Sequence, residues 1–172
     1  MIEEQALQAL LDKQAITEAI YTYCRAVDRL DISLGHSIWH EDGIADYGAD
    51  YYQGPGRGVI DLICQHHENL ISHSHQVTNI LIDLDGDRAG SEAYVSGSMR
   101  VQRDGKIQHM GVWARYLDSW EKREGRWGLM RRETVFDHEE IREVTPMGRS
   151  LAFTRDRSDP SYAYVGRLSE VG

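Results

Sequence analysis

Residues 75–105 read HQVTNILIDLDGDRAGSEAYVSGSMRVQRDG, and this stretch decides the fold. Apolar and polar side chains alternate over residues 77–84 and again over residues 89–103, which is the pattern of strands with one buried face. A DGD turn at residues 85–87 separates the two strands, and Asp104-Gly105 ends the second with a dipeptide typical of hairpins. The stretch therefore predicts two antiparallel strands joined by a tight turn.

The same pattern continues after this stretch. Residues 106–122 predict a long third strand, an Arg-Glu-Gly turn at residues 123–125 reverses the chain, and residues 126–137 predict a fourth strand. These connections are too short for the helical crossovers that parallel neighbours need. A doubly wound parallel sheet is therefore excluded.

Helices are expected before the strands. Over residues 3–31, apolar side chains recur at steps of three and four with no proline or glycine between them, which predicts one long amphipathic helix or two shorter ones. A second helix is expected over residues 32–40 and a third over residues 59–71, with the turn-rich GIADYGADYYQGPGRG between them. Helices followed by antiparallel strands predict an α+β fold with three N-terminal helices on one face of the sheet.

Length and charge limit the classes of function. The 172 residues suit one domain, expected over residues 1–140, followed by a charged tail over residues 141–172 that has no clear period. We expect this tail to pack on the domain or on a neighbouring subunit. The net charge of −9, without a cluster of lysine and arginine, would repel nucleic acid and an anionic membrane surface, so neither is expected as a partner.

The N-terminus and the cysteines indicate the compartment. The acidic, amphipathic start lacks the basic residues and the apolar stretch of a signal peptide, so a cytoplasmic location is expected. Cys24 and Cys64 are the two cysteines, and neither belongs to a CxxC pattern, which disfavours a disulfide scaffold or a zinc ribbon. Both are expected to be buried thiols.

Asp28 and His75 are the candidates for catalytic chemistry. Asp28 lies near the end of the long helix in YCRAVDRLD, and His75 lies where the third helix gives way to the first predicted strand. Imidazole, with an unperturbed pKa of about 6.5, is the usual general base, and a carboxylate on its second nitrogen fixes the tautomer and raises its basicity. The alternative is a solvated charge at the helix end and a structural histidine at the strand.

Four further residues are candidates for substrate binding. Tyr23 lies on the long helix, Tyr47 follows the second helix, and His109 and Arg132 lie on predicted central strands. Each offers a donor that could hold a carbonyl or a developing oxyanion. A structural role is the alternative for each of them.

Metal and cofactor sites have little support in the sequence. His73 with His75, and His36 with His40, each share a face of their expected element, but neither pair has a third ligand at a recognisable distance. HExxH, GxGxxG, P-loop and GxSxG patterns are absent. We therefore expect neither a metal nor a cofactor.

Four motifs together resemble the SnoaL-like family, which has the nuclear-transport-factor-2-like fold. They read AVDRLD (26–31), IADYGADYYQGPG (44–56), HSHQVTNILIDLDGDRA (73–89) and WARYLDSWEKREGRWGLMRRE (113–133). The most specific element is His-x-x-Thr-Asn at residues 75–79. The family implies a cone-shaped roll in which a curved antiparallel sheet and helices enclose a cofactor-free pocket. It also implies a homo-oligomer, with a trimer favoured over a dimer.

Within the family, the sequence is similar to the scytalone dehydratase, lindane dehydrochlorinase and bile-acid 7-alpha-dehydratase groups. The resemblance implies a catalytic dyad of Asp28 and His75, substrate-binding positions at Tyr23, Tyr47 and Arg132, and a second histidine at His109. It implies a lyase, most simply a dehydratase, that abstracts a proton from a hydrophobic cyclic substrate. The alternatives are an isomerase or polyketide cyclase, and a non-catalytic binding module such as the small subunit of a ring-hydroxylating oxygenase.

Overall fold

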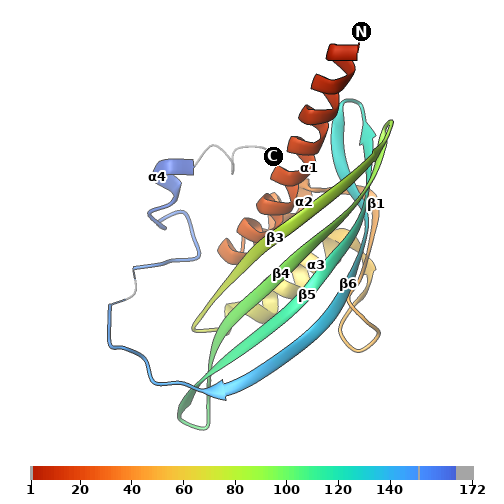
Figure 1. Ribbon diagram of the computed structural model, residues 1–172. Helices are drawn as coiled ribbons and strands as arrows, with labels where there is room; N and C mark the ends of the chain where they lie inside the picture. The colour runs from red at the N-terminus through yellow and green to blue at the C-terminus, as the bar shows by residue number, and fades with distance from the viewer. Residues whose placement is uncertain (1, 151, 166–172) are drawn as a thin grey trace.

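The computed structural model describes residues 2–150 and 152–165. Its elements in chain order are α1 (Ile2–Arg29), α2 (Ile32–Ser37), β1 (Trp39–Asp46), β2 (Gln53–Pro55), α3 (Gly56–Glu68), β3 (Ser72–Asp85), β4 (Arg88–Arg103), β5 (Lys106–Arg123), β6 (Arg126–Glu143) and α4 (Tyr162–Val165). Six strands form one sheet in the order β2-β1-β6-β5-β4-β3, and α1, α2 and α3 lie along one face of its curve (Figure 1). This arrangement confirms the predicted α+β fold class.

Strands β3 to β6 form an antiparallel meander with tight turns. Asp104 and Gly105 have φ angles of 51° and 75°, and Glu124 and Gly125 have φ angles of 52° and 79°. Two consecutive residues with positive φ are what a type I′ hairpin turn requires. The turns predicted from these two dipeptides are therefore confirmed.

Strand β1 and the ends of several elements differ from the sequence expectations, among them α3, which covers Gly56–Glu68 rather than residues 59–71. The second helix ends at Ser37, and the residues that follow form β1, which pairs in parallel with β6 and antiparallel with β2. A register shift between Trp39 and Ile44 interrupts the alternation of buried and exposed side chains along β1, so this strand cannot be recognised from the sequence pattern. Strand β3 begins at Ser72 rather than at residue 77, and β6 continues to Glu143.

Helix α1 packs on the sheet through its second half. Ile16, Ile20, Tyr23 and Val27 recur at steps of four, three and four, and each is at most 1% exposed. The first turns extend past the sheet (Figure 1), where the apolar side chains expected to join this stripe are more than half exposed: Leu7, Leu10 and Leu11. The buried stripe of α1 therefore begins at Ile16.

A buried ion pair lies in the core beneath α1. The guanidinium of Arg132 on β6 donates from Nε and Nη2 to the two carboxylate oxygens of Asp118 on β5, each at 2.7 Å, and both side chains are 0% exposed. The guanidinium carbon lies 4.2 Å from the ring centroid of Tyr23 and 3.8 Å from that of Tyr116. Two aromatic faces and a bidentate carboxylate together compensate the charge of Arg132.

The tail beyond β6 returns to the helices of its own chain. Arg155 donates to the backbone carbonyl of His67 at the end of α3, Asp159 pairs with Arg29 at 3.5 Å, and Arg25 donates to the hydroxyl of Ser161. These contacts connect the tail to α1 and α3. The division into a domain over residues 1–140 and a tail over residues 141–172 stays a prediction.

The last two features of the fold are the burial of its cysteines and the character of its helices. Cys24 and Cys64 are free and buried, as expected, and burial raises their pKa values to about 12 and about 11, respectively. No helix within residues 2–150 and 152–165 combines the length and apolar character needed to cross a bilayer.

The buried ion pair yields a stability prediction. Arg132→Met or Asp118→Leu alone should lower the free energy of unfolding by about 3–5 kcal/mol, because each leaves an uncompensated charge in the core. The double variant should be more stable than either single variant. Urea denaturation followed by circular dichroism measures all three.

The control is a pair on the same two strands that lies nearer to solvent. Arg115 contacts Asp137 at 3.3 Å, and their side chains are 28% and 35% exposed. Arg115→Met should cost less than about 1 kcal/mol, as exposed ion pairs usually do. Equal losses from Arg115→Met and Arg132→Met would contradict this account of the core.

Candidate active site

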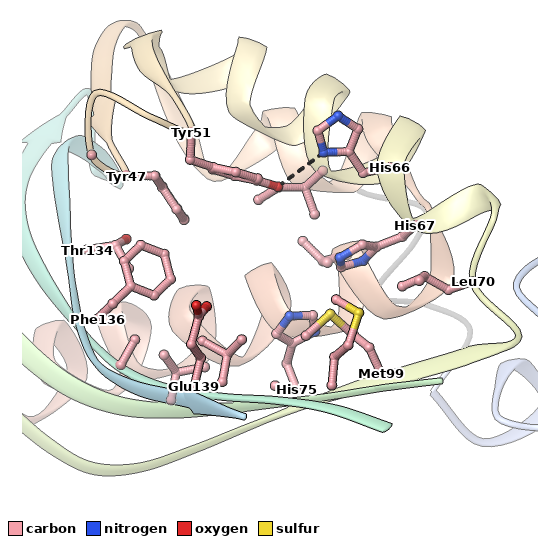
Figure 2. A pocket seen from close by; sticks show the side chains of 18 of the residues that line it. Tyr47, Tyr51, His66, His67, Leu70, His75, Met99, Thr134, Phe136 and Glu139 are labelled. Atoms are coloured by element: carbon pink, nitrogen blue, oxygen red, sulfur yellow. Dashed lines mark hydrogen bonds between the residues drawn. The ribbon is translucent and has the colours of Figure 1, made fainter. Parts of the chain in front are cut away.

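A cavity of about 580 Å³ opens between α1, α3 and the concave face of the sheet. Its walls are mainly apolar side chains, and those from the sheet include Val95, Met99, Met110 and Val112. Helices α1 and α3 close the other side, and polar side chains such as Tyr51, His66 and His75 border the space, as Figure 2 shows. A cavity of this kind suits an apolar ring system with few polar substituents.

Asp28 and His75 meet at the edge of this cavity. Asp28 lies in the last turn of α1, and His75 lies near the start of β3. Nδ1 of His75 is 2.7 Å from Oδ1 of Asp28, and the backbone N–H of His75 donates to Oδ2 at 3.0 Å. The two side chains are 14% and 16% exposed for His75 and Asp28, respectively. Both carboxylate oxygens of Asp28, on the helical side, therefore accept hydrogen bonds from His75 on the sheet.

These hydrogen bonds fix the tautomer of neutral His75. A carboxylate only accepts, so Nδ1 carries the ring hydrogen and Nε2 is free to accept a proton. Nε2 has no hydrogen-bond partner within the described chain, and Gly97, opposite His75 on β4, places no side chain in front of it. A Cβ atom at Gly97 would lie 3.6 Å from Nε2. The proton-accepting atom is therefore open toward the cavity.

Two further histidines surround His75. The ring of His67 on α3 stacks on that of His75, with centroids 5.7 Å apart and planes inclined by 19°. The ring of His73 lies 4.4 Å from that of His67, and its Nε2 donates to the backbone carbonyl of Val27 at 3.1 Å. Burial lowers the pKa of His73 and lowers the pKa of His67 to about 3. Both rings are therefore neutral at physiological pH.

Tyr23 and Tyr47 form a second polar group on the cavity wall. Their hydroxyl oxygens are 2.6 Å apart, and burial raises the pKa of Tyr23 well above its ordinary value. Because one hydroxyl donates to the other, the accepting tyrosine keeps its own hydrogen for a ligand. The pair can therefore donate one hydrogen bond into the cavity.

His109 and Arg132 are not among the residues that line the cavity, and the substrate-binding role expected for them stays a prediction. His109 points to the outer face of the sheet, where its Nε2 lies 3.0 Å from the hydroxyl of Ser98, while the next residue, Met110, points inward. Arg132 is held by Asp118 beneath the cavity wall. Successive side chains of a strand point to opposite faces of the sheet, but the sequence does not show which of the two sets of side chains points toward the cavity.

The cavity also contains polar residues that the sequence motifs did not indicate. His66 and Tyr51 approach each other at 3.5 Å on the helical side, and Glu139 points in from β6 (Figure 2). His67 could have been found from its spacing, because it continues the buried stripe of Ile60, Ile63 and Cys64 along α3.

Two further histidines have structural partners. His36 lies 2.8 Å from Asp61, and Nε2 of His40 lies 2.9 Å from the carbonyl oxygen of Glu121. Residues 2–150 and 152–165 hold no cluster of three ligands that could bind a metal ion.

Solved structures resemble this chain over most of its length. Hexachlorocyclohexane dehydrochlorinase LinA-type3 from Novosphingobium barchaimii has a TM-score of 0.70 and 19% identity, covering 85% of this chain and 99% of its own. A candidate scytalone dehydratase from Novosphingobium aromaticivorans has a TM-score of 0.67 and 21% identity, covering 83% and 97%. A candidate aromatic ring hydroxylase from the same organism has a TM-score of 0.66 and 26% identity, covering 78% and 94%. These likenesses establish the shared fold.

Curated proteins and family models give different results. No curated protein matches the sequence significantly. The model of the SnoaL-like domain matches residues 8–133, which is most of the chain and includes Asp28 and His75. The chain therefore belongs to the SnoaL-like family.

Proposed function

We propose that this protein is a cofactor-independent lyase, a dehydratase, that acts on a hydrophobic cyclic substrate. The supporting observation is the 2.7 Å contact between Nδ1 of His75 and Asp28, which leaves Nε2 open to an apolar cavity of about 580 Å³. The similar dehydrochlorinase and the candidate scytalone dehydratase carry the names of elimination enzymes. The proposal places their type of chemistry on the dyad of this chain.

Proton abstraction is the first task of the dyad. Nε2 of His75 takes a proton from the carbon beside a carbonyl group, and Asp28 stabilises the imidazolium that forms. The free hydrogen of the Tyr23–Tyr47 pair binds the carbonyl oxygen as negative charge develops on it. Imidazolium His75 then returns the proton to the departing oxygen, so that water leaves and the dyad is regenerated.

Other reactions and roles remain as outcomes of the test. An isomerase or cyclase would use the same proton abstraction but release no water. A non-catalytic binding module, or a small subunit of a ring-hydroxylating oxygenase, would bind a ring compound without changing its mass. A cytoplasmic location and a homo-oligomer, with a trimer favoured, belong to this proposal.

Replacing either member of the dyad should remove turnover. A panel of cyclic β-hydroxy ketones is incubated with the protein, and mass spectrometry detects the loss of one water. His75→Ala and Asp28→Asn should each reduce this rate by at least about 10²-fold, since general base catalysis supplies about 10² to 10⁴.

The surface histidine His36, which pairs with Asp61, supplies the matched control. His36→Ala should retain the wild-type rate, and circular dichroism should show that all three variants are folded. Conversion without loss of mass would favour the isomerase or cyclase. Unchanged turnover in His75→Ala would refute the proposed role of the dyad.

The open space in front of Nε2 yields a second prediction. Gly97→Val adds a side chain beside His75, since even its Cβ would lie 3.6 Å from Nε2, and should reduce kcat/KM at least tenfold by obstructing the substrate. A Cβ atom at Gly90 on the same strand would meet no atom within 4 Å, so Gly90→Val should change neither turnover nor stability. Steady-state kinetics compares the two variants, and equal rates would show that substrate does not approach His75 beside Gly97.

A further inference from the structure

We infer that His67 binds the leaving oxygen of the substrate, which makes the substrate class a cyclic β-hydroxy carbonyl compound. This inference rests on the proposed elimination at His75 and deepens it. The dyad explains how a proton is removed from carbon. It does not explain how the hydroxyl group on the next carbon is recognised, and His67 has no other assigned task.

The placement of His67 carries the inference. It lies at the end of α3 on the buried stripe of that helix, lines the cavity, and is 8% exposed. Its Nδ1 is enclosed and has no hydrogen-bond partner in the described residues. The ring edge that carries Nε2 is therefore the part that can meet a ligand, and Figure 2 shows the ring directed into the space above His75.

The stacking of the two rings matches the geometry of a β-elimination. The ring centroids of His67 and His75 are 5.7 Å apart and the planes are nearly parallel, so both rings border the same part of the cavity. The hydrogen on one carbon and the oxygen on the next carbon of a substrate lie within a few ångströms of each other. One ring can therefore meet the hydrogen while the other meets the oxygen.

The surroundings of His67 hold it neutral. Burial is the main cause of its lowered pKa of about 3, and the rings of His73, His75 and His66 and the guanidinium of Arg155 add to the effect. The carboxylate of Asp28 is bound to His75 on the neighbouring strand. When His75 takes a proton, His67 thus stays uncharged and serves as a hydrogen-bond donor, as a neutral imidazole does in other enzymes.

Two contacts fix the position of His67. Arg155 from the tail donates to its backbone carbonyl, which holds the end of α3 in place. The ring of His73 packs against it at 4.4 Å and is itself anchored to the carbonyl oxygen of Val27. A group held by packing and by its backbone is preorganised to receive a substrate oxygen.

The complete step is balanced without any further reactant. The C–H bond breaks and its proton moves to Nε2 of His75, while the C–H electron pair forms the new C=C bond. The C–O bond breaks with its electron pair on oxygen, which accepts a hydrogen bond from His67 and then the proton from His75. The products are an unsaturated ketone and water.

Binding of a matched pair of ketones tests this role without turnover. In the inactive His75→Ala background, calorimetry measures Kd for 3-hydroxy-1-tetralone and for 1-tetralone, which lacks the hydroxyl group. We expect the hydroxylated ketone to bind about three- to tenfold more tightly, the usual range for one hydrogen bond. Adding His67→Phe should abolish this preference, and His67→Gln, whose amide N–H reaches a similar position, should restore part of it.

The two ligands distinguish a failure of the role inferred for His67 from a failure of the proposed elimination at His75. An unchanged Kd for 1-tetralone in the His67 variants shows that the cavity is intact. If the preference for the hydroxylated ketone survives His67→Phe, the role of His67 is overturned, even where elimination at His75 is observed. A failure of both ketones to bind also overturns it. Loss of the preference without any turnover in the wild type would instead retain the oxygen site and reject the proposed elimination.

Discussion

The two hydrogen bonds between His75 and Asp28 connect the helical layer to the sheet at the edge of the cavity. The carboxylate accepts from the ring at 2.7 Å and from the backbone of the same residue at 3.0 Å, so both the position and the orientation of the imidazole are fixed. Few other arrangements would satisfy a carboxylate that is 16% exposed. The tautomer of His75, the open Nε2 and the route to a substrate all depend on this contact.

The ion pair in the core is separate from the dyad at the edge of the cavity. Arg132 and Asp118 neutralise each other in the core beneath Tyr23, whereas the two histidines beside His75, His67 and His73, have pKa values lowered by burial. Next to His75 the cavity therefore presents hydrogen bonds from neutral rings, whereas the charged groups of its lining, Asp50, Arg103 and Glu139, belong to other parts of the wall. Neutral surroundings beside the dyad leave the proton taken by His75 as the main new charge to be stabilised there during the reaction.

The sequence predicts much of the fold and part of the site. Helix periodicity and the Asp104-Gly105 turn are local signals, so the order of helices and hairpins is visible in the chain. Strand β1 is not, because a register shift interrupts its alternation and its partner β6 is distant in sequence. Asp28 and His75 follow from the family resemblance, whereas the direction of the His109 side chain does not follow from the sequence, because tertiary packing decides which set of a strand faces inward. His67 follows the stripe of α3, but only the folded chain shows that this stripe ends beside His75.

The protonation pattern of His75 is the most direct test of the central claim. Long-range ¹H–¹⁵N NMR of the wild-type protein, at a pH where the ring is neutral, distinguishes a hydrogen on Nδ1 from one on Nε2. The account predicts the Nδ1–H tautomer with a bare Nε2, and a weaker preference for it in Asp28→Asn. A ring that carries its hydrogen on Nε2 in the wild type would contradict the claim, because that atom could not then accept a proton from substrate.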